Sequence, residues 1–113
     1  MKKKILILGA TGFIGNALLN YLKTNTNEEI IPTLSRDNYN LLDQKNMYKI
    51  IKDKKPDIII NCLGVVGGIQ WGIKNKLKIT LENNILTMNL LNAIKSKKIY
   101  LINIIANCIY PHK

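Results

Sequence analysis

The chain has 113 residues, which is enough for one domain and too few for two. Hydrophobic residues make up 47% and charged residues 21% of the sequence, proportions that exclude a disordered or collagen-like protein. The net charge of +10 comes almost entirely from scattered lysines, and Arg36 is the only arginine. This pattern argues against a nucleic-acid-binding protein, in which arginine usually clusters with lysine.

No segment has the pattern of a signal peptide or a membrane span. The apolar run at residues 5–8 stops at Gly9, whereas a signal peptide needs ~7–15 apolar residues and a span about 20. We therefore expect a cytoplasmic protein. In that compartment Cys62 and Cys108 are expected to be free thiols, and no metal site is predicted.

Short apolar strands and amphipathic helices alternate in the first half of the chain. Residues 4–8 form a continuous apolar run of the kind found in strands that are buried on both faces. A glycine-rich turn at 9–15 and an amphipathic helix follow, and residues 29–34 are the second expected strand. Residues 40–43 are expected to form a short third strand and turn, where Asp43 can cap the next helix.

The second half of the chain repeats this alternation. Residues 57–62 are the clearest buried strand, a glycine-bearing loop is expected over 63–72, and residues 99–105 are the last strand. Between them, a longer helix over 79–96 is expected to face the core with Leu81, Ile85, Met88, Leu91 and Ile94. The pattern predicts an α/β fold: a Rossmann-type, doubly wound parallel sheet that is truncated after its fifth strand.

The turn between the first strand and the first helix has the spacing Gly-x-x-Gly-x-x-Gly. A diphosphate needs backbone N–H donors at close range and gains from the positive end of a helix dipole. Gly9 is suited to the tight turn, Gly12 to the close approach of the diphosphate and Gly15 to packing of the helix on the strand. Because a strand precedes the motif and a helix follows it, we interpret it as a dinucleotide-binding turn rather than an ordinary βα turn.

The end of the second strand distinguishes NAD from NADP. NAD sites usually place Asp or Glu there, about 20 residues beyond the glycine turn, to bind the ribose hydroxyls. Here the position reads Leu34-Ser35-Arg36, and a guanidinium can pair with a phosphate through two hydrogen bonds. The sequence therefore favours NADP(H) over NAD.

Four segments together resemble the extended short-chain dehydrogenase/reductases, or NAD-dependent epimerase/dehydratase family, and within it the GDP-L-fucose synthases. They are residues 9–15, residues 35–43, Val66-Gly67-Gly68-Ile69 and Cys108-Ile109-Tyr110-Pro111. The resemblance covers the whole chain and about the first third of such an enzyme. It implies a nucleotide-sugar epimerase/reductase that epimerises C3 and C5 of GDP-4-keto-6-deoxy-mannose and then reduces the 4-keto group with NADPH.

The resemblance also implies roles for individual residues. The diphosphate would lie on the glycine turn, which consists of Gly9, Ala10, Thr11, Gly12, Phe13, Ile14 and Gly15. The adenosine and its 2′-phosphate would contact Arg36, Asp37, Asn38, Tyr39, Asn40 and Leu41. The nicotinamide side would be lined by Ile104, Ile105, Ala106 and Asn107. Cys108 would be the acid/base of the epimerisation.

The sequence departs from this family at the catalytic centre. Ala106 stands where the family has a serine that binds the keto oxygen, and Tyr110 has no lysine at the spacing of the family's Tyr-x-x-x-Lys pair. We therefore expect residues 1–113 to be an incomplete dinucleotide-binding domain without the substrate domain. Such a chain would be inactive alone and would associate with itself or with a missing C-terminal half. The alternative functions are an inactive dinucleotide-binding module and a part of another nucleotide-sugar epimerase/dehydratase or reductase.

Overall fold

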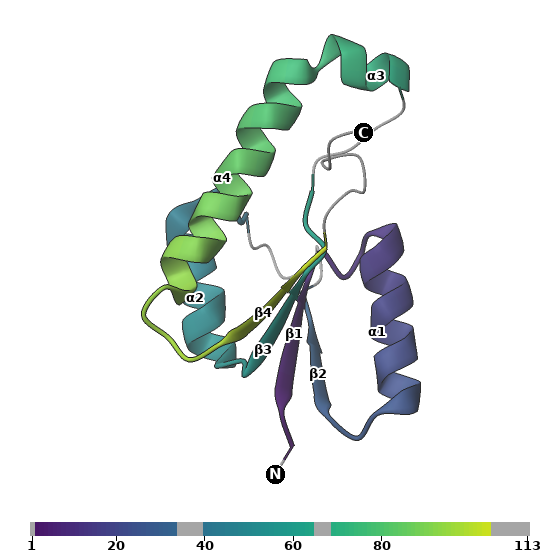
Figure 1. The fold of residues 1–113 in the computed structure, drawn as a ribbon, viewed down its shortest axis with the longest axis vertical. Coiled ribbons are helices and arrows are strands. Elements are labelled where there is room, and N and C mark those ends of the chain that lie inside the picture. Colours follow the sequence, from purple (N-terminus) through teal and green to yellow (C-terminus); the bar gives the residue numbers. More distant parts are fainter. Residues whose placement is uncertain (1, 34–39, 65–68, 105–113) are drawn as a thin grey trace, which may run out of the picture.

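The computed structural model describes residues 2–33, 40–64 and 69–104. In chain order the elements are β1 (Lys4–Leu8), α1 (Phe13–Asn25), β2 (Glu29–Pro32), α2 (Gln44–Lys54), β3 (Ile58–Asn61), α3 (Ile69–Lys74), α4 (Lys76–Ile94) and β4 (Tyr100–Asn103). The strands are parallel, in the order β2-β1-β3-β4, with α1 on one face of the sheet and α2 and α4 on the other (Figure 1). The expected Rossmann-type, doubly wound sheet is confirmed.

Alternate side chains of β1 supply two separate cores. Leu6 and Leu8 pack beneath α2 and α4, against a set that includes Ile59 of β3. Ile7 points to the other face and packs against Leu19 of α1. Leu6, Ile7 and Leu8 each have an exposed fraction of 0%, which explains why β1 is apolar at consecutive residues after Lys4 rather than at every second one.

The expected third strand at residues 40–43 is wrong, because these residues form a turn in the structure. Asn89 of α4 donates from its side-chain Nδ2 to the backbone carbonyls of Leu41 and Leu42, at 2.9 and 3.0 Å. These hydrogen bonds hold the turn against the helix and occupy carbonyls that a strand would use for pairing. The described residues therefore form four strands, and the sheet ends at β2 on this side.

Helix α4 turns a different face to the core than its apolar periodicity predicts. Leu81, Ile85, Met88 and Leu91, all expected inside, are between 41% and 56% exposed. The buried residues of this helix are instead Asn89, Leu90 and Ala93, while Ile94 is partly buried. The hydrogen bonds of the Asn89 amide allow this polar residue to lie inside, which shifts the inward face away from the most apolar one.

Other boundaries differ by smaller amounts. Helix α4 begins at Lys76, ahead of the expected start, and α3 begins inside residues 63–72, which were expected to be a loop. Asp43 caps α2 as expected, because its carboxylate accepts from the backbone N–H of Lys45 at 3.0 Å. No helix within the described ranges has the length and hydrophobicity that crossing a membrane requires.

Candidate functional site

The glycine turn lies at the carboxyl edge of the sheet, between the end of β1 and the start of α1 (Figure 1). The strands beside β1 are β2 and β3, and the helices that lead to them cover opposite faces of the sheet. The direction of winding therefore reverses next to β1. In open α/β sheets, the ligand-binding crevice forms at such a reversal.

Two of the three glycines are required by the packing of the fold. Gly9 has a φ of +78°, and a Cβ at this position would lie 2.8 Å from the carbonyl oxygen of Cys62, just beyond β3. A Cβ on Gly15 would lie 2.0 Å from the carbonyl oxygen of Gly9, because the first turn of α1 rests directly on the glycine turn. A side chain at either position would push β3 or α1 away from β1.

Gly12 differs from the other two, because the fold does not require a glycine there. Among the described residues, the one atom within 4 Å of a Cβ at position 12 would be the carbonyl oxygen of Gly9, at 3.4 Å. Its φ of −77° is accessible to any residue, and it serves as the N-cap of α1 without a side-chain hydrogen bond. The turn is therefore open at Gly12, where a ligand can approach the backbone closely.

The first turn of α1 offers backbone N–H groups to a ligand. The hydrogen-bond ladder of the helix starts with the N–H of Asn16, which donates to the carbonyl of Gly12 at 2.9 Å. The preceding amides of Phe13, Ile14 and Gly15 have no acceptor within the described part of the chain. The first turn also contains no acidic residue that would neutralise the positive end of the helix dipole. This arrangement can bind an anion such as a diphosphate.

Thr33 holds the glycine turn from the side of β2. Its hydroxyl donates to the carbonyl of Ile7 at 2.9 Å and accepts from the N–H of Gly9 at 3.1 Å, and the residue is 9% exposed. A single side chain thus joins the end of β2 to β1 and to the first residue of the turn. The sequence carries no signal for this role, because a threonine after a strand is common and its partners are distant along the chain.

Removal of the Thr33 hydroxyl is expected to loosen the turn. In Thr33→Val the side-chain volume is kept, but the partly buried N–H of Gly9 loses its acceptor, so we expect a loss of about 1–2 kcal/mol in the free energy of unfolding. Thr33→Ser keeps the hydroxyl and should lose less. Urea denaturation followed by circular dichroism measures both variants, and wild-type stability of the valine variant would contradict the role of this hydroxyl.

The fold and the glycine turn agree with a known family. A family model described as the NAD dependent epimerase/dehydratase family matches residues 5–113, which is nearly the whole chain. The chain belongs to the NAD-dependent epimerase/dehydratase family. The resemblance noted from the sequence is thereby confirmed.

Three named proteins are similar to this chain over a part of their length. GDP-L-colitose synthase of Yersinia pseudotuberculosis is 38% identical over 109 residues, which cover 96% of this chain and 35% of that protein. GDP-L-fucose synthase of Azorhizobium caulinodans is 31% identical over 110 residues, with the same two shares. The structure of MlghC, the GDP-mannoheptose C4 reductase from Campylobacter jejuni with NADP bound, superposes with a TM-score of 0.80 at 20% identity, over 90% of this chain and 32% of that one. The chain thus spans 35% of the length of the curated relatives it matches.

The structure describes some, but not all, of the site residues that the resemblance to the family implies. The glycine turn and Ile104, which is 40% exposed directly after β4, lie at the same edge of the sheet. Within the turn, Phe13 is 94% exposed whereas Ala10 is buried. Leu41 packs into the core beneath α2 and α4, so its side chain is not free to contact a ligand. Asn40 is exposed, and its side-chain oxygen accepts from the N–H of Leu42 at 3.2 Å in the turn before α2. The remaining expected site residues lie outside the described residues: Arg36, Asp37, Asn38, Tyr39, Ile105, Ala106, Asn107 and Cys108.

The described cysteine, Cys62, has a packing role. It contacts the core that Ile7 forms with α1, and burial raises the pKa of its thiol, so the thiol is neutral at pH 7. It is a free cysteine, as expected. Among the described residues, no group of His, Cys, Asp and Glu side chains is arranged to hold a metal ion.

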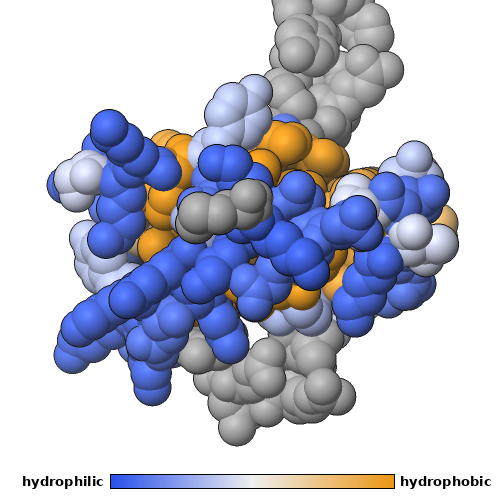
Figure 2. Space-filling view, turned by 90° about the horizontal axis from the view of Figure 1, so that it is seen from below, coloured by the Kyte–Doolittle hydropathy of each residue, from blue (hydrophilic) through white to orange (hydrophobic). Residues whose placement is uncertain are grey.

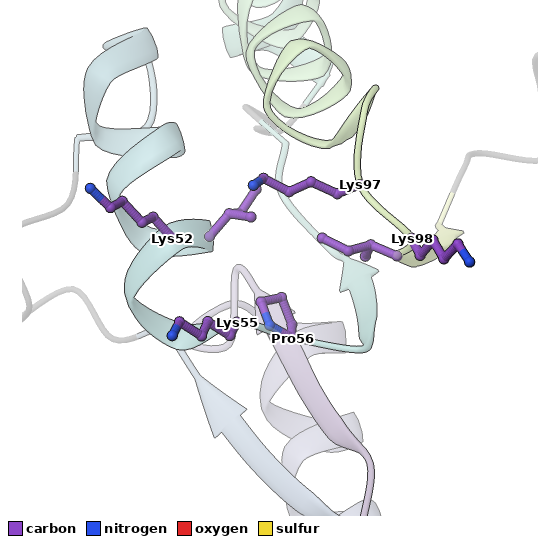
Figure 3. A pocket seen from close by; sticks show the side chains of 7 residues that line it. Lys52, Lys55, Pro56, Lys97 and Lys98 are labelled. Carbon is purple, nitrogen blue, oxygen red and sulfur yellow. The ribbon is translucent and has the colours of Figure 1, made fainter.

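A hollow of about 360 Å³ lies at the opposite, amino-terminal edge of the sheet, where the surface is mostly hydrophilic (Figure 2). It is lined by Ile51, Lys52, Lys55, Pro56, Lys97, Lys98 and Ile99. Figure 3 shows the ammonium groups of Lys52, Lys55 and Lys98 pointing away from the hollow rather than toward a common centre. Lysines are favoured beside the carboxyl ends of helices, and their stems cover apolar surface. The hollow therefore has no converging donors, and the glycine turn is the candidate site.

Proposed function

We propose that residues 1–113 are the NADP(H)-binding part of a nucleotide-sugar epimerase/reductase that acts on a GDP sugar. The observation that carries this proposal is the set of amides at the start of α1 that have no acceptor among the described residues, beside a turn that is open at Gly12. Both curated relatives are named as GDP-sugar synthases, and the related reductase structure contains NADP. These names support the class of substrate and the choice of cofactor.

The described residues fit a dinucleotide at the glycine turn. A side chain at Gly12 would fill the open side of the turn, whereas glycine leaves room for a diphosphate to reach the amides of Phe13, Ile14 and Gly15. When bound, the cofactor supplies the hydride for reduction of a keto group. We assign the adenosine and its 2′-phosphate to Arg36, Asp37, Asn38, Tyr39 and Asn40, and to the backbone of Leu41, whose side chain is buried in the core. We assign the nicotinamide side to Ile104, Ile105, Ala106 and Asn107.

The finer proposal is the reaction of the GDP-L-fucose synthases. It consists of epimerisation at C3 and C5 of GDP-4-keto-6-deoxy-mannose, followed by reduction at C4. The keto group acidifies the adjacent C–H bonds, so a side chain that exchanges a proton there can invert the carbon. Cys108 is the proposed acid/base, and a lowered thiol pKa would favour this role.

We propose that the sugar-binding part of the enzyme lies outside these residues. The matched relatives are far longer than this chain, which covers 35% of each. An apolar stripe on α4 supports the proposal, because stripes of this kind are usually covered by another part of a protein. It consists of Leu77, Leu81, Ile85, Met88 and Leu91. A C-terminal half or a second copy of the chain would cover this stripe, and light scattering of the chain alone over a range of concentrations distinguishes the two.

The test of the proposed function compares NADPH and NADH binding by the wild type and Arg36→Ala. We expect the wild type to prefer NADPH, and Arg36→Ala to weaken NADPH binding by about tenfold to a hundredfold, because a hydrogen bond to a charged group contributes about 1.5–3 kcal/mol. Binding of NADH should not change. Lys23→Ala, at the amino-terminal edge, is the control for loss of a positive charge. Equal losses for both cofactors would contradict the NADP assignment, and no binding of either would contradict the function.

A further inference from the structure

Two asparagines end neighbouring strands at the same edge as the glycine turn. Asn61 is the last residue of β3, Asn103 is the last residue of β4, and the two are register partners. Leu8, the last residue of β1, is in turn the register partner of Asn61. The three residues form one row that begins at the glycine turn. Because neighbouring strands are about 4.8 Å apart, Asn103 lies roughly 10 Å along this row from Leu8.

Hydrogen bonds determine which way both side-chain amides point. The backbone N–H of Leu63 can only donate, so the Asn61 atom that it contacts at 3.1 Å is the oxygen Oδ1. The Nδ2 group of Asn61 must then face Asn103, and it donates to Oδ1 of Asn103 at 2.8 Å. The oxygen of Asn103 is thereby occupied. Its Nδ2 group has no acceptor in the described part of the chain and is offered as a donor.

The difference in burial between the two asparagines separates their roles. Asn61 is 7% exposed with both polar ends of its amide bonded, whereas Asn103 is exposed. An exposed asparagine ordinarily rotates and offers a donor or an acceptor equally well. Here the hydrogen bond from the buried Asn61 amide holds the Asn103 amide in one orientation. Less conformational entropy is therefore lost when a ligand binds to this side chain. Strand pairing does not require two hydrogen-bonded asparagines at these positions, because two apolar residues of similar shape would stabilise the fold about equally well.

We propose that Asn103 donates through Nδ2 to an acceptor oxygen of the nicotinamide riboside of the bound dinucleotide, and that Asn61 positions it. This inference rests on the proposed function, because it starts from a diphosphate on the glycine turn. The adenosine side of that ligand is assigned to the end of β2, so the other half extends over β3 and β4. The row from Leu8 to Asn103 runs in this direction. The ribose hydroxyls and the carboxamide oxygen are the acceptors on that half.

The test uses two ligands that differ by the nicotinamide half, NADPH and adenosine 2′,5′-bisphosphate. Asn103→Asp keeps an acceptor for Asn61 but turns the outward group from a donor into an acceptor. We expect NADPH binding to weaken by about tenfold, the equivalent of one lost hydrogen bond, with binding of the bisphosphate unchanged. Asn27→Asp, an exposed residue between α1 and β2 at the opposite edge, makes the same chemical change and should alter neither ligand.

A second variant tests the positioning role without changing the binding residue. In Asn61→Asp the carboxylate still accepts from Leu63 but has no donor for Asn103. The Asn103 amide must then turn over to donate to it, which leaves Oδ1 outward in place of Nδ2. We expect the same selective loss of NADPH binding, of about tenfold.

Three outcomes would overturn the inference. Unchanged NADPH binding by Asn103→Asp would do so, as would a parallel loss of NADPH and bisphosphate binding, which would indicate a general structural effect. In both cases the proposed function would stand. If the wild type bound no NADPH at all, the proposed function would fail and this inference with it.

Discussion

Replacement of Gly15 by alanine is expected to lower the melting temperature of the protein by more than about 10 °C. The added Cβ would lie 2.0 Å from the carbonyl oxygen of Gly9 and 2.8 Å from its carbonyl carbon, and both are backbone atoms that no side-chain rotation can move. Helix α1 would have to shift off β1 and lose the packing of Leu19 on Ile7. Strain of this size corresponds to about 3 kcal/mol or more, at roughly 4 °C per kcal/mol for a chain of this length.

Gly72→Ala is the matched control for this substitution. Gly72 lies in helix α3, where, within the described ranges, an added Cβ would meet only the side chain of Ile79, at 3.9 Å. Alanine is the better helix former by about 0.8–1 kcal/mol, so the control should melt at or slightly above the wild-type temperature. Thermal melts followed by circular dichroism measure both variants. A Gly15→Ala variant that melted like the wild type would contradict the contact between α1 and the glycine turn.

Gly12→Ala is expected to separate cofactor binding from folding. Its Cβ would meet the carbonyl oxygen of Gly9 at 3.4 Å, an ordinary contact, so we expect the variant to fold with a melting temperature near that of the wild type. The same methyl group would stand on the open side of the turn, in the space assigned to the diphosphate. We therefore expect NADPH affinity to fall at least about tenfold, or 1.4 kcal/mol.

Calorimetric titration of the folded Gly12→Ala variant with NADPH measures this loss. Gly15→Ala should lose stability, whereas Gly12→Ala should lose NADPH affinity alone. Unchanged affinity in Gly12→Ala would mean that the cofactor does not cross the turn at this residue. A severe loss of stability would mean that the turn is closed at Gly12 rather than open.

Local sequence signals predicted the part of the fold that carries the site. The continuous apolar run of β1, the glycine spacing and the start of α1 are adjacent in the chain, so residue type and spacing define them together. The motif predicts a glycine at positions 9 and 15, and the structure gives a reason for each. Gly9 has a positive φ, and at Gly15 helix α1 packs directly on the turn. The parallel sheet followed from the alternation of strands and helices.

Contacts between distant residues explain what the sequence could not predict. The turn at residues 40–43 and the rotation of α4 both depend on Asn89, whose partners lie 47 and 48 residues away. Hydrophobic periodicity predicts that an asparagine lies on the solvent face of a helix. It carries no information about distant backbone carbonyls that can accept hydrogen bonds from a buried amide. Thr33 and the pair of Asn61 with Asn103 were missed for the same reason, since their partners are set by strand register.

The binding of a diphosphate by the backbone at the start of α1 is tested most directly by a nuclear magnetic resonance titration of ¹⁵N-labelled protein with NADPH. We predict that the largest saturable shifts belong to the amides of Phe13, Ile14 and Gly15, which have no acceptor within the described chain. Unshifted signals from these three amides, with the largest changes instead around Lys55 and Lys97 at the opposite edge, would contradict this assignment.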